Sequence, residues 1–265
     1  MKNFRVACGQ FFVKKGEKEK NISQMIDYAE SAADNSCDLI LFPELSLTGI
    51  IPPKELKKMA EPLDGINIRK LVKISEEKKI AIAFGFAEFC YDSKNYFNSM
   101  VIINKKEGIV GVYRKMHLWD TDKDWAHKGD SIITCKIEKT IISCWICYDT
   151  RFPEIGRLAA LKGADLALVS TAWLGPRDEW ELSLRGRAID NSIFVAGADL
   201  IDEEMNCIGL SMIVDPFGKI LKKAKPREEG ILFTDLNAED RIKQVKRLQL
   251  IESRCPENYK AIVKK

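Results

Sequence analysis

The feature that most constrains the fold of this chain is a series of short apolar runs, most of them four to eight residues long and rich in Ile and Val. Runs of this length and composition are typical of strands that are buried on at least one face. The sequence therefore predicts a fold built on buried sheets. The runs lie at residues 6–10, 39–42, 80–86, 99–103, 109–113, 132–137, 141–147, 166–170, 193–198, 209–214 and 231–234.

Helical patterns separate several of these runs. Between residues 21 and 33, apolar side chains recur at intervals of three and four and form one stripe, which is typical of an amphipathic helix. Residues 66–79, 153–162 and 179–191 show similar spacing, and turn-forming residues at 104–108 and 215–218 predict hairpins. Strands mixed with helices and hairpins predict a layered α/β fold with a large mixed sheet system.

Composition limits the number of domains and the classes of function. A chain of 265 residues fits one large domain or two small ones, and no Ser/Gly-rich or Pro-rich linker divides it. We therefore expect a single domain over residues 1–265. The 42 Lys and Arg residues nearly balance the 39 Asp and Glu residues, so the chain lacks the concentrated basic excess of a nucleic-acid-binding protein.

The cellular compartment is predicted from the cysteines and from the apolar segments. Eight cysteines are scattered singly through apolar stretches, which favours the reducing cytoplasm over a secreted disulfide framework. No apolar run approaches the ~20 residues needed to cross a bilayer, so we expect no membrane association. Arg5 interrupts the apolar stretch at the N-terminus, and no small-residue cleavage pattern follows, so we expect no signal peptide.

Three of the apolar runs lead directly into a residue with catalytic chemistry. Glu44 follows the run at 39–42 in apolar company, where loss of solvent would raise its pKa and suit it to general-base work. Lys115 places a cation after the run at 109–113. Cys147 ends the run at 141–147 shortly before a proline opens a helix, and a thiol at such an elbow faces substrate. Taken singly, each also fits an ordinary role as a solvated glutamate, a surface lysine or a buried structural cysteine.

Cys144 and Cys147 also form a Cys-x-x-Cys motif, which raises the possibilities of a zinc site and of a redox pair. A structural zinc ion needs four ligands, but the chain has only two histidines and no second motif of this kind. A thioredoxin-type pair opens a helix, whereas here the apolar run continues as far as Cys147. Two residues three apart in one strand would also lie on opposite faces. We therefore expect neither a metal site nor a redox pair.

Three segments together resemble the nitrilase superfamily of carbon–nitrogen hydrolases. They are LILFPELSLTG around Glu44, YRKMHL around Lys115 and CWICYDTRFPE around Cys147, and they follow the chain order of the Glu-Lys-Cys triad of that family. Shorter similarities at 6–10, 98–99, 164–170, 185–191 and 215–218 extend the resemblance over most of the chain. It implies a four-layer αββα sandwich of two mixed sheets, assembled through a helix-covered face into a homodimer or a higher homo-oligomer.

The resemblance also implies roles that agree with the chemistry of the residues. Cys147 is the expected nucleophile, Glu44 the general base, and Lys115 the cation that faces the tetrahedral intermediate. The backbone N–H of Tyr148, which follows the nucleophile, is expected to complete an oxyanion hole with Lys115.

Many members of the family carry a second glutamate after the lysine. Its expected counterpart in this chain is Asp122, which would support Lys115 or the substrate, with Asp120 and Asp124 as alternatives.

The expected reaction is thiol-dependent cleavage of the C–N bond of a small linear amide through a cysteine thioester, with release of ammonia. Water and the amide are the expected partners, and no metal or organic cofactor is needed. A nitrilase commonly carries a Trp-Glu pair after its cysteine, where this chain has Tyr148, so the resemblance favours amidases. An N-carbamoyl amidohydrolase, a nitrilase and a catalytically inactive binding or scaffold protein remain the alternatives.

Arg151 is the candidate for substrate recognition, and Trp173 is included with it among the expected substrate-binding residues. The segment CYDTRFPE is similar to that of amidases of the omega-amidase-like branch, which act on monoamides of dicarboxylic acids. A guanidinium group can give two parallel hydrogen bonds to a carboxylate, so Arg151 would hold an acid group of the substrate. The alternative is a structural ion pair of Arg151 with Glu154 or Asp149.

Overall fold

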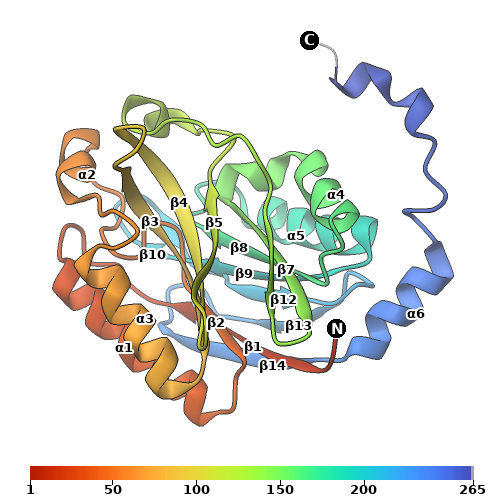
Figure 1. Cartoon of the computed structure of the whole chain (residues 1–265), viewed down its shortest axis with the longest axis horizontal. Helices are drawn as coiled ribbons and strands as arrows, with labels where there is room; N and C mark the ends of the chain where they lie inside the picture. Colours follow the sequence, from red (N-terminus) through yellow and green to blue (C-terminus); the bar gives the residue numbers. More distant parts are fainter. Residues whose placement is uncertain (264–265) are drawn as a thin grey trace.

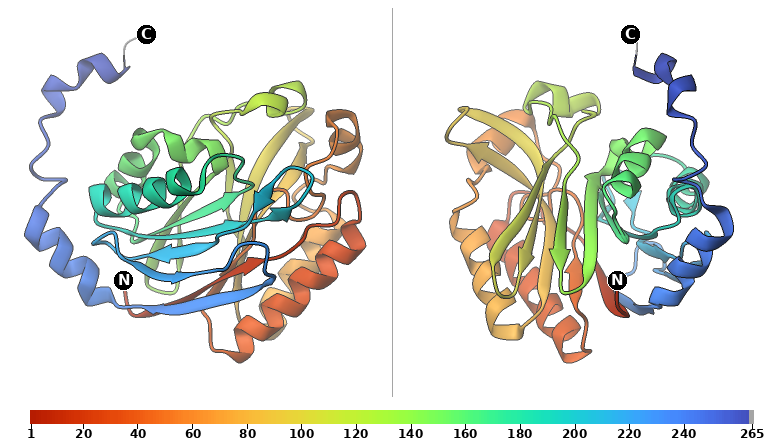
Figure 2. Two further views of the ribbon diagram at one scale, coloured as in Figure 1. Left: turned by 180° about the vertical axis from the view of Figure 1, so that it is seen from behind. Right: turned by 45° about the vertical axis from the view of Figure 1, so that its right-hand side comes forward.

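The computed structural model describes residues 1–263 and arranges them in four layers (Figures 1 and 2). Two six-stranded mixed sheets face each other, and helices cover the outer face of each sheet. The predicted αββα sandwich is therefore confirmed.

The first sheet has the strand order β14-β1-β2-β3-β4-β5. Strands β1, β2 and β3 are parallel to one another, and the remaining pairings are antiparallel. Helices α1 (Lys18–Asp34) and α3 (Ile66–Lys78) pack on its outer face. The strands span Phe4–Gln10 (β1), Leu39–Leu41 (β2), Ala81–Cys90 (β3), Asn95–Asn104 (β4), Gly108–Arg114 (β5) and Gly230–Leu236 (β14).

The second sheet has the strand order β13-β12-β9-β8-β7-β6, with β7, β8 and β9 parallel. Helices α4 (Pro153–Leu161) and α5 (Arg177–Asn191) pack on its outer face. The strands span Thr134–Ile137 (β6), Thr140–Ile146 (β7), Leu166–Thr171 (β8), Phe194–Asp199 (β9), Met212–Val214 (β12) and Ile220–Lys223 (β13).

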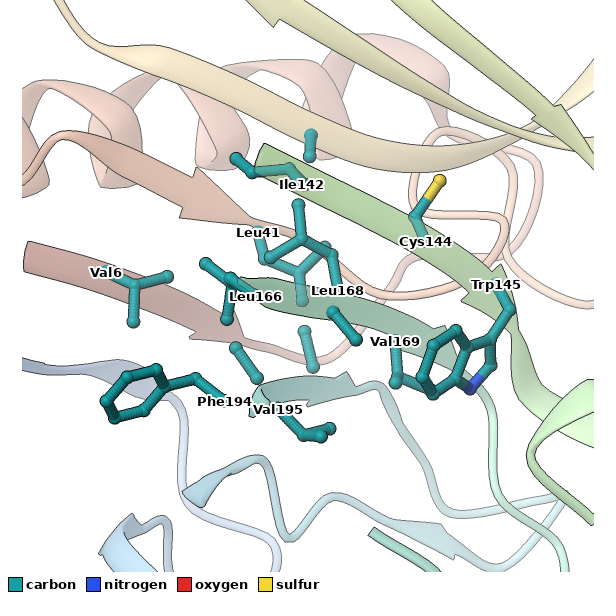
Figure 3. Close-up of a cluster of buried hydrophobic side chains, with 14 of the residues drawn as sticks. Val6, Leu41, Ile142, Cys144, Trp145, Leu166, Leu168, Val169, Phe194 and Val195 are labelled. Atoms are coloured by element: carbon teal, nitrogen blue, oxygen red, sulfur yellow. The ribbon is translucent and has the colours of Figure 1, made fainter. Parts of the chain in front are cut away.

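Successive side chains of a strand point to opposite faces of its sheet, and this alternation builds two cores. In β2, Leu39 and Leu41 pack between the two sheets, whereas Ile40 packs under α1 and α3. Figure 3 shows Leu41 of the first sheet beside Leu168 of the second. All of these side chains are fully buried. Because β2 is buried on both faces, its sequence reads as a continuous apolar run rather than an alternating one.

The eleven apolar runs all contain strands, and the two predicted hairpins join β4 to β5 and β12 to β13. One boundary matters for the site, because β7 ends at Ile146 and leaves Cys147 outside the strand, where the apolar run had placed it inside.

Among the strands and α-helices, five were not marked by an apolar run or a helical pattern. Strands β10 (Ile201–Asp202) and β11 (Cys207–Ile208) are only two residues long, and the outer half of β13 consists of exposed lysines. Helix α2 (Pro53–Met59) buries one side chain, and α6 (Ala238–Leu248) is mostly polar.

The C-terminal segment leaves the body of the molecule. Helix α6 follows β14, and the chain beyond it, with the short turns at Pro256–Asn258 and Lys260–Val263, extends away from both sheets (Figure 1). Within residues 1–263, no helix is both long and apolar enough to cross a membrane.

Candidate active site

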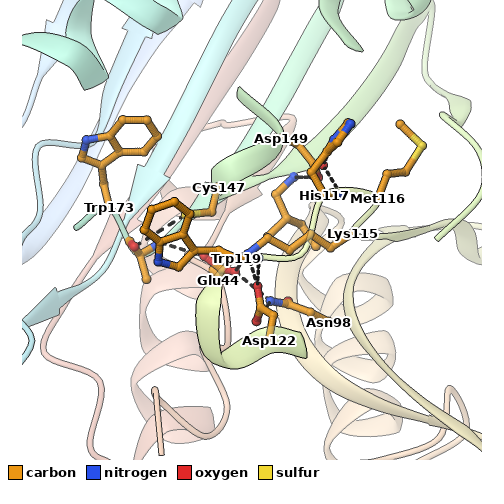
Figure 4. A network of polar contacts seen from close by, with 12 residues as sticks. Glu44, Asn98, Lys115, Met116, His117, Trp119, Asp122, Cys147, Asp149 and Trp173 are labelled. Carbon is orange, nitrogen blue, oxygen red and sulfur yellow. Dashed lines mark hydrogen bonds and ion pairs between the residues drawn. The ribbon is translucent and has the colours of Figure 1, made fainter. Parts of the chain in front are cut away.

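The three candidate catalytic residues meet where the two sheets face each other (Figure 4). Glu44 lies in the loop after β2 and Lys115 directly after β5, so both come from the first sheet. Cys147 follows β7 of the second sheet. The site therefore requires both sheets, and residues that are 71 positions apart, Glu44 and Lys115, are in direct contact.

Lys115 is held between two carboxylates. Its Nζ donates to Oε1 of Glu44 at 2.7 Å and to Oδ2 of Asp122 at 2.6 Å. The side-chain amide of Asn98 donates to the same Glu44 oxygen at 2.7 Å and to Oδ1 of Asp122 at 3.2 Å. All four side chains are buried, so these contacts replace the water that each charge would otherwise bind.

The charges in this cluster influence one another strongly. Burial raises the pKa of Glu44 above its ordinary value, and the neighbouring Lys115 ammonium offsets only part of that effect. Burial acts against the charged form of Lys115, but Glu44, Cys147 and Asp122 outweigh it and raise its pKa well above the usual range. Lys115 therefore remains an ammonium group, while Glu44 holds a proton more readily than an exposed glutamate does.

The second oxygen of Glu44 is fixed from the other sheet, since the backbone N–H of Ala172 donates to Oε2 at 3.0 Å. The loop that carries Glu44 also lies tightly against β3. A Cβ atom at Gly85 would lie 2.7 Å from Cα of Glu44, so this position tolerates no side chain. Both oxygens and the backbone of Glu44 are thereby held in place.

Cys147 occupies a sharp turn from strand to helix. Its φ is +45°, in the left-handed region that a non-glycine residue adopts at a cost of about 1–3 kcal/mol. The thiol Sγ lies 3.6 Å from the carbonyl oxygen of Ala172. Burial, together with the carboxylate of Glu44, raises the pKa of the thiol well above its usual range. The resting thiol is therefore protonated, and its attack on a substrate requires a base.

Asp149 holds this turn in place through its carboxylate. It is fully buried and accepts hydrogen bonds from the Tyr113 hydroxyl at 2.7 Å, the His117 backbone N–H at 2.9 Å and the Ile146 backbone N–H at 3.2 Å. The segment that carries Lys115 and the turn that carries Cys147 are thus tied to one carboxylate.

A cavity of about 190 Å³ opens onto Cys147. Arg151 forms part of its wall, with its guanidinium carbon 4.7 Å from the centroid of the Trp173 ring. Nη2 of Arg151 lies 2.6 Å from Oε2 of Glu179, so its ion-pair partner is neither Glu154 nor Asp149. The lining consists of Trp119, Cys147, Tyr148, Arg151, Ala172, Trp173, Leu174 and Gly175.

The structure separates the three aspartates after Lys115. Asp122 is buried against Lys115, whereas Asp120 and Asp124 are exposed. Tyr148 lies in the wall of the cavity, and its ring centroid is 4.7 Å from that of Trp119.

Asn98 and Asp149 are contacts that the sequence analysis did not assign to the site. The sequence analysis named Asn98 only as part of the family resemblance, and Asp149 only as a possible ion-pair partner of Arg151. Cys144 packs in the core between the sheets, and all eight cysteines are free. Residues 1–263 contain no group of three or more His, Cys, Asp or Glu side chains placed to hold a metal ion.

Residues 5–246 match the carbon-nitrogen hydrolase family. The chain belongs to that family. The chain is 31% identical over 267 residues to a Schizosaccharomyces pombe protein named a probable nitrilase, covering 97% of this chain and 98% of the relative. It is 29% identical to the 2-oxoglutaramate amidase of Bacillus subtilis, covering 89% of this chain and 91% of the relative. With the omega-amidase NIT2 of Homo sapiens the identity is 28%, over 89% of this chain and 90% of the relative.

Solved structures of this superfamily share the fold. Saccharomyces cerevisiae Nit3, described as a member of branch 10 of the nitrilase superfamily, superposes with a TM-score of 0.88 at 23% identity, covering 96% of this chain and 97% of Nit3. An amidase from Nesterenkonia sp. superposes with a TM-score of 0.86 at 23% identity, over 98% of this chain and 96% of the amidase. The expected family and fold are both confirmed.

Asp122 is predicted to orient Lys115. Asp122→Asn removes one of the two carboxylate charges that contact the buried Lys115 ammonium. We expect the kcat of C–N hydrolysis to fall by roughly tenfold or more, because small displacements at a reacting centre are costly. Asp120→Asn and Asp124→Asn are the matched controls and are expected to change kcat less than about twofold, since exposed charges contribute little. Steady-state kinetics of the three variants test this, and a larger loss in Asp124→Asn than in Asp122→Asn would contradict it.

Proposed function

We propose that this chain hydrolyses the C–N bond of small linear amides, with Cys147 as nucleophile, Glu44 as general base and Lys115 as the cation facing the developing oxyanion. The observation that carries the proposal is the buried Glu44–Lys115 pair, 2.7 Å apart, between the sheets beside a cavity that opens onto Cys147. The family membership of the chain supports it, as do the amidase names of several relatives.

The first half of the reaction forms a thioester. Glu44 takes the proton of the Cys147 thiol as Sγ bonds to the carbonyl carbon of the amide. The oxyanion that forms lies against the Lys115 ammonium and the backbone N–H of Tyr148. Protonated Glu44 then donates to the leaving nitrogen, and the C–N bond breaks with release of ammonia.

The second half restores the enzyme. Water attacks the thioester carbon while Glu44 takes one of its protons, and the same cation and backbone N–H stabilise the second oxyanion. The C–S bond breaks, the proton returns to sulfur, and the carboxylic acid leaves. Glu44 is suited to both halves because burial raises its pKa, which makes it a stronger base than an exposed glutamate while it can still return the proton.

The test of this function is a panel of small amides, N-carbamoyl compounds and nitriles, assayed for ammonia release. We expect turnover of amides to exceed that of nitriles. Cys147→Ala should abolish turnover with little change in melting temperature, because it removes one atom from a side chain that borders the cavity. The control, Cys144→Ala, should retain turnover and lose about 1 kcal/mol of stability, since Cys144 is fully buried in the core. Retained turnover in Cys147→Ala would overturn the mechanism, and an inactive wild-type chain would favour a scaffold role.

The pH dependence follows from Glu44. The base must be ionised in the free enzyme, and burial raises its pKa, so kcat/KM should fall on acidification at a pH above the ~4.3 of an ordinary glutamate. A pH–rate profile of kcat/KM measures this limb, with circular dichroism at each pH as the control for unfolding. An acid limb at or below the ordinary glutamate value would contradict the assignment of Glu44.

We further propose that the amide carries a carboxylate a few bonds from the scissile carbonyl, and that Arg151 holds it. Arg151 borders the cavity that opens onto Cys147, and its planar group already lies over Trp173, which would fix its orientation. Its pairing with Glu179 is partly exposed, and an exposed ion pair of this kind is worth only about 0–1 kcal/mol. A substrate carboxylate can therefore displace Glu179.

Arg151→Lys tests this substrate class. Losing a two-point charged contact should raise KM for an acid-bearing amide by roughly tenfold or more, and much less for a neutral amide of equal length. Glu179→Gln is the matched control, because it removes the competing carboxylate and should lower KM for the acid-bearing amide. Equal effects of Arg151→Lys on the two substrates, or a wild-type preference for the neutral amide, would leave Arg151 a structural residue.

We propose a homodimer formed through the α4–α5 face. Leu158 and Leu161 are each 42% exposed there and border a groove of about 750 Å³. The same groove reaches Ile262 in the C-terminal segment, which leaves the body of its own chain (Figure 1). Apolar surface of this extent favours burial against a second copy.

Light scattering at micromolar concentration should give a mass near twice the 30.1 kDa of one chain. Leu158→Asp should shift the mass toward a single chain, because it places a charge in the contact. Ile66→Asp, at an apolar position of α3 that is 60% exposed and lies on the other side of the molecule, should not. A wild-type mass of one chain would contradict the dimer.

We also propose that residues 1–265 act as one catalytic domain in a reducing cytoplasm. The site draws its residues from both sheets, which share one core, and this supports a single unit. The eight free cysteines support the compartment.

A further inference from the structure

The peptide unit between Ala172 and Trp173, directly after β8, has one contact on each side. Its carbonyl oxygen, on Ala172, is the atom 3.6 Å from Sγ of Cys147. Its N–H, on Trp173, donates to Oδ1 of Asp199 at 2.9 Å. The carbonyl and the N–H of a trans peptide point in opposite directions in one rigid plane. A group that fixes the N–H therefore also fixes the direction of the carbonyl.

Ala172 contacts the base as well as the thiol, because its own N–H donates to Oε2 of Glu44 at 3.0 Å. This N–H belongs to the preceding peptide, which meets the 172–173 peptide at Cα of Ala172. Rotation of the 172–173 plane turns the carbonyl that faces the thiol, whereas a shift of the Ala172 Cα moves both contacts. Figure 4 shows Trp173 next to Cys147 on the side of the site away from Lys115. The hydrogen bonds of Ala172 are thus a second support for the site, separate from the Lys115 cluster.

Asp199, which accepts the Trp173 N–H, is itself held rigidly. It is the last residue of β9, opposite Thr171 of β8, and it is 1% exposed. Its backbone N–H donates to Oγ of Ser211 at 2.9 Å, and the N–H of Ser211 donates to Gln10 at 2.9 Å. Its carboxyl group is placed by a strand and a hydrogen-bonded neighbour, so it can define the position of the loop after β8.

We propose that Asp199 is a positioning residue for the reaction, because its hydrogen bond to the Trp173 N–H holds the 172–173 peptide, and with it the Ala172 carbonyl that orients the Cys147 thiol toward Glu44. This inference deepens the proposed function and rests on it. Asp199 touches neither reacting group, and its effect passes through the backbone of one peptide.

The state of Asp199 indicates which substitution preserves the contact. Burial raises the pKa of Asp199 well above its usual range, which favours the protonated acid. The carbonyl oxygen of a protonated acid accepts the Trp173 N–H as the amide oxygen of asparagine does. Asp199→Asn therefore keeps the acceptor, whereas Asp199→Ala and the larger Asp199→Leu remove it.

The control is Asp215, another buried carboxyl that accepts backbone N–H groups. It is 5% exposed and accepts from Phe217 and Lys219, each at 2.9 Å, in the turn between β12 and β13. Its contacts are of the same kind as those of Asp199 but lie outside the lining of the cavity. Asp215→Ala reports what the loss of such a carboxyl does to stability alone.

The experiment compares kcat and KM on one small amide, melting temperature, and the rate at which iodoacetamide alkylates Cys147, followed by mass spectrometry of the peptide that contains it. Asp199→Ala should lower kcat by roughly tenfold or more with a smaller change in KM, and should slow alkylation, because thiol and base are no longer aligned. Asp199→Asn should keep kcat and the alkylation rate within about threefold of the wild type. Asp215→Ala should lose stability while keeping kcat and alkylation rate.

Wild-type kcat and alkylation in folded Asp199→Ala, or in Asp199→Leu if the alanine variant does not fold, would overturn the proposal. So would an Asp199→Asn enzyme as impaired as Asp199→Ala, or an equal loss of kcat in Asp215→Ala. If the wild-type chain releases no ammonia from any amide, the proposed function fails, while the alkylation rates still test the role of Asp199.

Discussion

The rest of this structure depends on a buried ammonium group. Lys115 is 2% exposed, and a charge withdrawn from water to that extent is tolerated only when oppositely charged groups surround it. Glu44 and Asp122 supply those charges, and Asn98 connects the two carboxylates by donating to both. Because removing Lys115 would leave two carboxylates in the interior without an opposite charge, the loops that carry these residues are held in one arrangement. The same requirement that stabilises the cluster also sets the geometry of the chemistry.

The cluster also divides the work between a group that keeps its charge and a group that changes it. Lys115 lies between two carboxylates, both of which favour its positive form. Two effects oppose each other in setting the pKa of Glu44: burial favours its neutral form, and Lys115 favours its charged form. A fixed cation beside a carboxyl group that exchanges protons readily suits a reaction that creates an oxyanion and transfers a proton twice. The protonated thiol of Cys147 completes this arrangement, because it provides the proton to be transferred.

The sequence predicted the fold and the candidate catalytic residues where local pattern determines structure. Strands buried on both faces read as apolar runs, and Glu44 and Lys115 stand where such runs end. The polar parts of β13 and α6 were missed because little of either element is buried. Asn98 and Asp149 were missed for another reason. Their hydrogen bonds reach residues 54 and 36 positions away, and nothing in the local sequence reports a contact of that range.

The origin of the site in two different sheets has a consequence for how the protein matures. Glu44 is carried by the first sheet, and the peptide that holds its second oxygen by the second, so the base is oriented only after the two sheets have closed on each other. A partly folded chain could form either sheet and still have no competent site. Catalytic activity therefore reports whether the two sheets have closed on each other. A chain arrested before closure would carry Cys147 without the base that makes it reactive.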